Sequence, residues 1–124
     1  MPREVIGQAA AGAPYSKAIR AGDFVYVSGQ VPMTPDGKLV TGTIEDQTRQ
    51  VMENIKAALA EAGCDMQDVV KCTGWLGDAR DFARFNKVYT SFFEGSLPAR
   101  SCVESRLMIT ADVEVEAIAY KPKA

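Results

Sequence analysis

Two segments of the chain have apolar residues at helical spacing. The first runs from about Ile44 to Ala62, with Thr43 placed to cap its start and Gly63 to end it. The second is expected to begin after Asp78, whose side chain is suited to a helix cap. Its apolar stripe consists of Phe82, Phe85, Val88, Tyr89 and Phe92. The pattern therefore predicts two amphipathic helices.

Other segments are rich in β-branched and aromatic residues, which favour strands. The predicted strands are Lys17–Arg20, Phe24–Ser28, Val69–Leu76, Ser101–Glu104 and Asp112–Tyr120. The first two are predicted to form a hairpin around the turn at 21–23. In the last strand, residues 113, 115, 117 and 119 are apolar or small and share one face, whereas Glu114 and Glu116 lie on the other.

These elements follow one another as β-β-α-β-α-β-β. The order predicts one α+β domain over residues 1–124, with a mixed sheet and two helices on one of its faces. Helical crossovers favour parallel pairing, and hairpins add antiparallel strands. Because both helices are expected on one face, the other face stays uncovered, and a second copy of the chain is expected to cover it.

Composition and charge exclude several classes of function. Fourteen basic and sixteen acidic residues give a net charge of −2, with no basic stripe of the kind that nucleic acid binding requires. No apolar stretch approaches the roughly 20 residues of a membrane span, and the first residues do not resemble a signal peptide. We therefore expect a cytoplasmic protein without nucleic acid or membrane partners.

Three dispersed cysteines and no histidine also argue against a metal site or a catalytic triad, and no cofactor is expected.

Candidate chemistry lies in three places. Arg100 and Cys102 follow Pro98 at the entry to a strand, where a guanidinium can grip a carboxylate. Glu114 lies in the middle of the last strand, where it can orient water, pair with another subunit or simply be solvated. Tyr15 lies in the N-terminal segment, and Ser28-Gly29 places a hydroxyl and an exposed backbone at a strand end. Each feature taken alone is more often structural than functional.

Taken together, several motifs resemble the Rid family, also called YjgF-like, of reactive-intermediate deaminases. The motifs are Pro14-Tyr15-Ser16, Val27–Pro32, Gln47–Gln50 with Asn54, Asp81-Phe82 with Asn86, Pro98–Glu104 and Val113–Ala119. They follow the order of the family's motifs from about residue 12 to residue 120. The pieces Pro-Ala-Arg-Ser and Glu-Ala-Ile-Ala are specific in combination.

The resemblance implies a chorismate-mutase-like α+β fold and a homotrimer with ligand clefts between subunits. It implies hydrolysis of 2-aminoacrylate and related enamines or imines to 2-keto acids and ammonia. Arg100 matches the arginine that holds the substrate carboxylate, Glu114 the acid that orients water, and Cys102 a backbone contact near the substrate nitrogen. The matched pocket-lining positions are Tyr15, Ser28, Gly29 and Asn86.

Some positions depart from the family pattern and keep other functions open. Trp75 replaces a smaller apolar residue, and the loop at 107–112 lacks its usual proline. One alternative is therefore a specialised catabolic deaminase, for example for 2-aminomuconate. Another is a regulatory protein that binds a 2-keto acid without turnover. A ribonuclease is disfavoured by the acidic balance and the lack of histidine.

Overall fold

The computed structural model describes residues 2–123. Its strands are β1 (Glu4–Ile6), β2 (Ala18–Ala21), β3 (Phe24–Gln30), β4 (Val69–Leu76), β5 (Ala99–Glu104) and β6 (Val113–Tyr120). Its helices are α1 (Ile44–Glu61) and α2 (Phe82–Thr90), and the short 3-10 turns η1 (Met66–Asp68) and η2 (Ala79–Asp81) precede β4 and α2. The predicted elements are all present, and β1 is an additional strand that the sequence pattern did not indicate.

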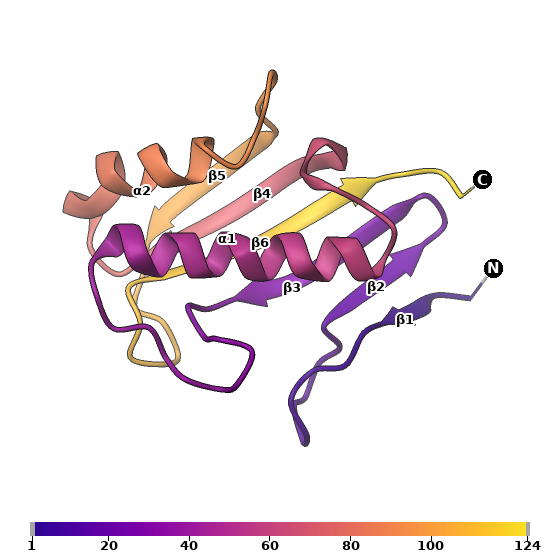
Figure 1. Cartoon of the computed structure of the whole chain (residues 1–124), viewed down its shortest axis with the longest axis horizontal. Coiled ribbons are helices and arrows are strands. Elements are labelled where there is room, and N and C mark those ends of the chain that lie inside the picture. The colour runs from indigo at the N-terminus through magenta and orange to yellow at the C-terminus, as the bar shows by residue number, and fades with distance from the viewer. Residues whose placement is uncertain (1, 124) are drawn as a thin grey trace.

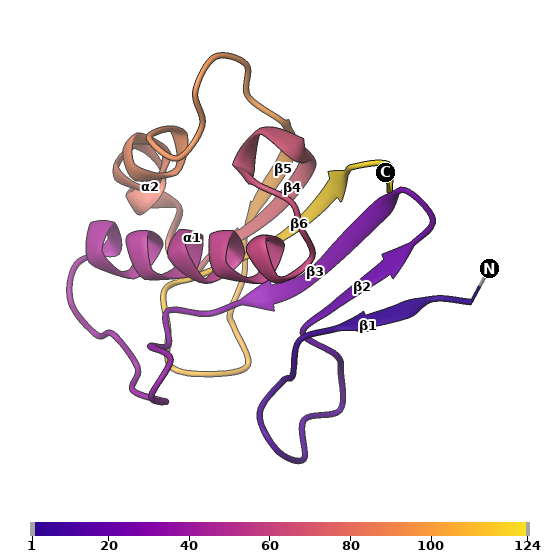
Figure 2. The ribbon, with the colours of Figure 1, turned by 45° about the vertical axis from the view of Figure 1, so that its right-hand side comes forward.

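The strands form one sheet in the order β1-β2-β3-β6-β4-β5. Only β4 and β5 pair in parallel, while the other neighbours are antiparallel. Both helices lie on the same face of this sheet, with α2 above β4 and β5 (Figure 1, Figure 2). The predicted α+β class is therefore confirmed. Parallel pairing through a helical crossover holds for β4 and β5 but not for β3 and β4, because β6 lies between them.

The core lies between the helices and the sheet. Helix α1 buries one apolar stripe that includes Val51, Met52 and Ile55, none of which is exposed. The alternation predicted for the last strand is confirmed, since Val113 and Val115 are buried on the helical face of β6. This burial supplies most of the force that holds α1 on the sheet.

Local interactions fix both ends of α1. The Thr43 hydroxyl accepts a hydrogen bond of 3.1 Å from the Asp46 backbone nitrogen, as expected for a helix cap. Gly63 has a positive φ of 77°, which ends the helix at low cost for glycine. Arg20, only 6% exposed, donates hydrogen bonds to the carbonyls of Ala62 and Lys121. The buried guanidinium therefore ties the end of α1 to the C-terminal strand.

The start of the second helix differs from the prediction. Asp78 accepts a hydrogen bond from the Arg80 nitrogen and caps the 3-10 turn η2, so that α2 itself begins at Phe82. The helix ends at Thr90, which leaves Phe92 beyond it. A cap on a 3-10 turn has the same local sequence as a cap on an α-helix, because both satisfy the free N–H groups of a first turn.

The other face of the sheet carries large apolar side chains that lie open to solvent. Phe24, Tyr26 and Tyr120 are 39–46% exposed, and the rings of Phe24 and Tyr120 meet edge to face at 5.1 Å. An exposed apolar surface on a small domain is typical of an association surface. A covering second copy stays a prediction. No helix among residues 2–123 has the length and apolar character needed to cross a membrane.

Candidate functional site

Arg100 lies on β5 with its side chain beneath helix α2. Its Nη1 donates a hydrogen bond of 2.8 Å to Oδ1 of Asn86. Its Cζ lies 4.8 Å from the ring centroid of Tyr89 and 5.5 Å from those of Phe82 and Phe85. Aromatic faces attract a cation at these distances, so three rings and one amide orient the guanidinium. Among the described residues Arg100 forms no ion pair, which leaves its charge available to an anion.

Cys102 follows Arg100 on the same face of β5, directly beside Gly74 of β4. A side chain at Gly74 would meet the Cys102 sulfur at 3.3 Å, so the glycine leaves room for the thiol. Burial raises the pKa of Cys102, and nearby Arg100 offsets this only in part. The thiol is therefore protonated at neutral pH and is a poor nucleophile. This favours a backbone contact over thiol chemistry at Cys102.

A second group of predicted residues lines a cavity of about 480 Å³ on the open face of the sheet, near the ends of β3 and β6. The lining residues are Tyr15, Ser28, Gly29, Val31, Met108, Ile109, Glu114 and Glu116. We call this the β3–β6 cavity. The Ser28 hydroxyl donates a hydrogen bond of 2.5 Å to the Ser16 carbonyl, which fixes the segment that carries Tyr15.

The side chain of Glu114 reaches from β6 to Gly29 of the neighbouring strand β3. A Cβ atom on Gly29 would lie 2.1 Å from Oε2 of Glu114, far inside van der Waals contact. Because glycine has no side chain, the carboxylate can occupy this position beside the β3 backbone. Burial, and secondarily the charge of Glu116, raise the pKa of Glu114 above its ordinary value of 4.5. A carboxyl group with a raised pKa is better able to exchange protons near neutral pH.

Arg100 and Glu114 lie on opposite faces of the sheet. In the parallel ladder Arg100 pairs with Cys72, which is fully buried beneath the helices. Glu114 pairs with Trp75 of the same strand, three residues further on, and therefore points the other way. Strand β4 also separates β5 from β6, which adds about 10 Å in the plane of the sheet. One copy of the chain therefore cannot bring both side chains to the same small ligand.

The seven predicted site residues thus divide into two groups. Arg100, Asn86 and Cys102 lie between β5 and α2, and the remaining four line the β3–β6 cavity. The sequence motifs did not indicate Met108 and Ile109, which lie in a loop without regular structure. They also did not indicate that the aromatic stripe of α2 would surround a guanidinium. That stripe shows helical spacing, which by itself is typical of a core-facing surface.

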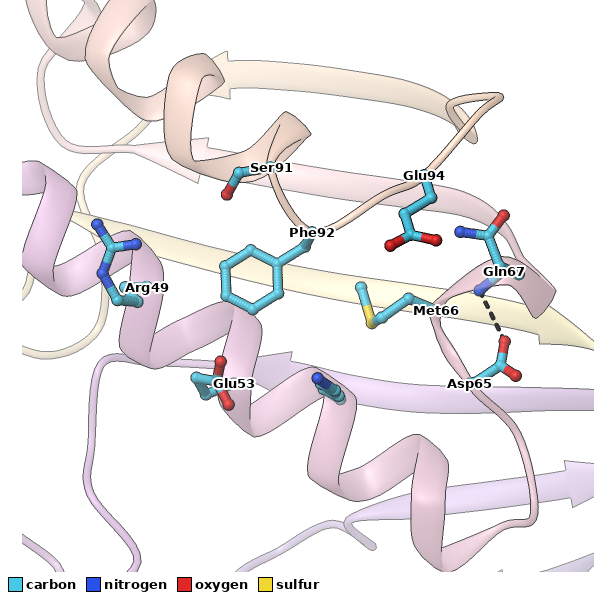
Figure 3. Close-up of a pocket in the computed structure, with 9 residues that line it drawn as sticks. Arg49, Glu53, Asp65, Met66, Gln67, Ser91, Phe92 and Glu94 are labelled. Atoms are coloured by element: carbon cyan, nitrogen blue, oxygen red, sulfur yellow. Dashed lines mark hydrogen bonds between the residues drawn. The ribbon is translucent and has the colours of Figure 1, made fainter.

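A further concavity of about 460 Å³ lies between α1, η1 and the loop after α2 (Figure 3). Arg49 and Glu53 of α1 face Glu94 across Phe92 and Met66. Charged side chains of both signs line this groove, and it includes none of the predicted site residues. Nothing in its arrangement resembles a reactive centre.

The chain is similar to known proteins over most of its length. The model of the endoribonuclease L-PSP family matches residues 6–121. A RutC family protein of Pyrococcus horikoshii is 54% identical over 110 residues, which is 87% of each chain. The 2-iminobutanoate/2-iminopropanoate deaminase of Mus musculus is 41% identical over 114 residues, covering 90% of this chain and 84% of the mouse protein. The crystal structure of E. coli TdcF with bound serine matches with a TM-score of 0.89 at 36% identity, over 95% of this chain and 98% of TdcF.

Proposed function

Because the chain belongs to the endoribonuclease L-PSP family, also called YjgF or Rid, we propose that it is an imine hydrolase. Its proposed reaction converts reactive 2-imino and 2-enamino acids, such as 2-aminoacrylate, to 2-keto acids and ammonia. The observation that carries the proposal is the guanidinium of Arg100, oriented by Asn86 and three aromatic rings yet without an acidic partner among the described residues. Such a cation is suited to the carboxylate that all these substrates share. The mouse relative named as an iminobutanoate deaminase supports the same chemistry.

The reaction needs little beyond positioning and proton transfer. An enamine first takes a proton from solvent on its terminal carbon and becomes an iminium ion, whose carbon is already electrophilic. Glu114, as a carboxylate, accepts a proton from water while the water oxygen bonds to that carbon. The same carboxyl group then returns the proton to the nitrogen of the resulting carbinolamine. As the carbon–nitrogen bond breaks and ammonia leaves, the hydroxyl oxygen forms the keto group and its proton passes to solvent. The raised pKa of Glu114 suits both directions of transfer.

The placement of the two groups leads to a proposal about assembly. Because Arg100 and Glu114 lie on opposite faces of one sheet, we propose that a complete site takes Arg100 from one copy and Glu114 from a neighbour. A homotrimer with clefts between subunits, as the family resemblance implies, meets this requirement. The exposed apolar side chains on the open face give such copies a surface on which to pack. We also propose that the protein is cytoplasmic.

Ribonuclease activity, which the name of the family suggests, has less support. The β3–β6 cavity carries two glutamates, which repel a phosphodiester, and the net charge of the chain is −2. The chain has no histidine to act as acid or base in cleaving RNA.

The test measures 2-keto acid formation from serine or threonine by a pyridoxal-phosphate-dependent dehydratase, with and without this protein. We expect acceleration that Arg100→Ala lowers tenfold or more, since charge-assisted hydrogen bonds contribute about 1.5–3 kcal/mol each. Arg49→Ala is the matched control, because Arg49 is an exposed arginine in the unrelated groove and should retain full activity. Equal rates with and without the wild-type protein would contradict the proposal and favour a protein that only binds a keto acid.

A further inference from the structure

The β3–β6 cavity has charge of only one sign. Its two ionisable acids, Glu114 and Glu116, lie two residues apart on the same face of β6, and the lining contains neither lysine nor arginine. Neither glutamate forms an ion pair among residues 2–123. On the neighbouring strand β4, the residue paired with Glu116 is the uncharged Thr73. No ion pair described in this copy therefore neutralises the acidic side of the cavity.

The rest of the lining is apolar or neutral. Val31, Met108 and Ile109 line the cavity together with the ring of Tyr15. Met108 is 94% exposed, and its unbranched thioether can adapt to aliphatic groups of different shape. Contact with an apolar side chain is favourable here, because it removes apolar area from water. A charged side chain would lose its hydration in the same place without gaining a partner of opposite charge.

Resting on the proposed function, we infer that Glu116 determines the charge selectivity of this cavity and rejects 2-imino acids that carry a second carboxylate. Arg100 of a neighbouring copy satisfies the carboxylate that every substrate carries. A second carboxylate then meets Glu116 with no cation from the cavity to balance it, and like charges brought together in a partly desolvated site repel strongly. Dicarboxylic substrates of the 2-aminomuconate type are accordingly disfavoured.

The experiment compares imines formed in place by an amino acid oxidase, with semicarbazide competing for the imine. Glutamate and glutamine give imines of nearly the same size that differ by one charge, and methionine gives an apolar imine. We expect the wild-type protein to prefer the methionine and glutamine imines to the glutamate imine by about tenfold or more in kcat/KM. Glu116→Gln should reduce the glutamine-to-glutamate ratio by about tenfold. Glu53→Gln, which removes an acid from the unrelated groove, should leave that ratio unchanged.

Two results would overturn the inference. One is equal turnover of the glutamine and glutamate imines by the wild-type protein. The other is a ratio that Glu116→Gln does not change, which would mean that size decides or that a neighbouring copy neutralises Glu116. Absence of turnover on every imine would instead contradict the proposed function. In that case the affinities for 2-ketobutyrate and 2-ketoglutarate still test the selectivity, because equal affinities would overturn it and a preference for 2-ketobutyrate that weakens in Glu116→Gln would support it.

Discussion

Replacing Gly29 with alanine should inactivate the protein without unfolding it. The new Cβ atom would lie 2.1 Å from Oε2 of Glu114, whereas ordinary contacts begin near 3.4 Å. The carboxylate must therefore move by about 1 Å, and a misplacement of this size at a reacting group typically costs about 100-fold in rate. This corresponds to about 2.7 kcal/mol of transition-state stabilisation.

The fold should tolerate the same change. Gly29 is not among the glycines with positive φ, so alanine can adopt its backbone conformation. The atom that must yield is the end of a flexible side chain rather than backbone. We expect the free energy of unfolding to change by no more than about 1 kcal/mol. The assay is kcat/KM for an imine, measured beside urea denaturation of the same preparation.

Gly42→Ala is a matched control for this experiment. Its Cβ atom would lie 2.8 Å from a carboxylate oxygen of Asp46, at the exposed start of α1 and outside the β3–β6 cavity. That variant should retain wild-type activity. In a Glu114→Ala background, Gly29→Ala should have no further effect, because the clashing carboxylate is gone. A Gly29→Ala protein with wild-type kcat/KM would refute the reasoning that the position of Glu114 controls the reaction.

Three other predictions concern stability and pH. Arg20→Met should lower the free energy of unfolding by about 3 kcal/mol in urea denaturation, because it removes the two charge-assisted hydrogen bonds to the carbonyls of Ala62 and Lys121. An unchanged midpoint would contradict this role. Thr43→Ala should lower the free energy of unfolding by about 1 kcal/mol in the same assay, because the helix cap is lost; a decrease of less than a few tenths of a kcal/mol would show that the cap contributes little. The raised pKa of Glu114 means that its ionisation opposes folding: the associated stability is full below pH 4.5 and is lost as pH rises through the higher folded value. Glu114→Gln should therefore raise Tm at pH 7 to 8 but not at pH 4, and an equal shift at both would refute the assignment.

The sequence predicts the helices and the central strands because their signals are local. Helix α1 has an apolar stripe together with a cap at Thr43 and a stop at Gly63, so three independent features agree. Strand β1 has no such signal, since its three residues are mostly exposed and become a strand only through pairing with β2. The predicted start of α2 was wrong, because Asp78 caps the 3-10 turn η2 and the α-helix begins only after that turn.

The candidate site shows a similar limit. Arg100 and Glu114 could be proposed from the sequence because each lies in a recognisable motif on a strand. Their placement on opposite faces depends on the register of β4 with both β5 and β6, and that register is set by packing between segments distant in the sequence. Contacts of Arg100 with the rings of α2 likewise follow from the tertiary structure.

The central claim, an imine hydrolase whose site combines Arg100 of one copy with Glu114 of another, can be tested by mixing two inactive variants. Arg100→Ala and Glu114→Gln are each purified, mixed in equal amounts, unfolded, refolded together and assayed for 2-keto acid formation. With random assembly, about a quarter of the sites between copies would receive both intact residues, so we predict recovery of about a quarter of wild-type activity. Either variant refolded alone should have about a tenth of wild-type activity or less. Mixed oligomers, identified by mass spectrometry, that remain as inactive as the separate variants would contradict a site shared between copies.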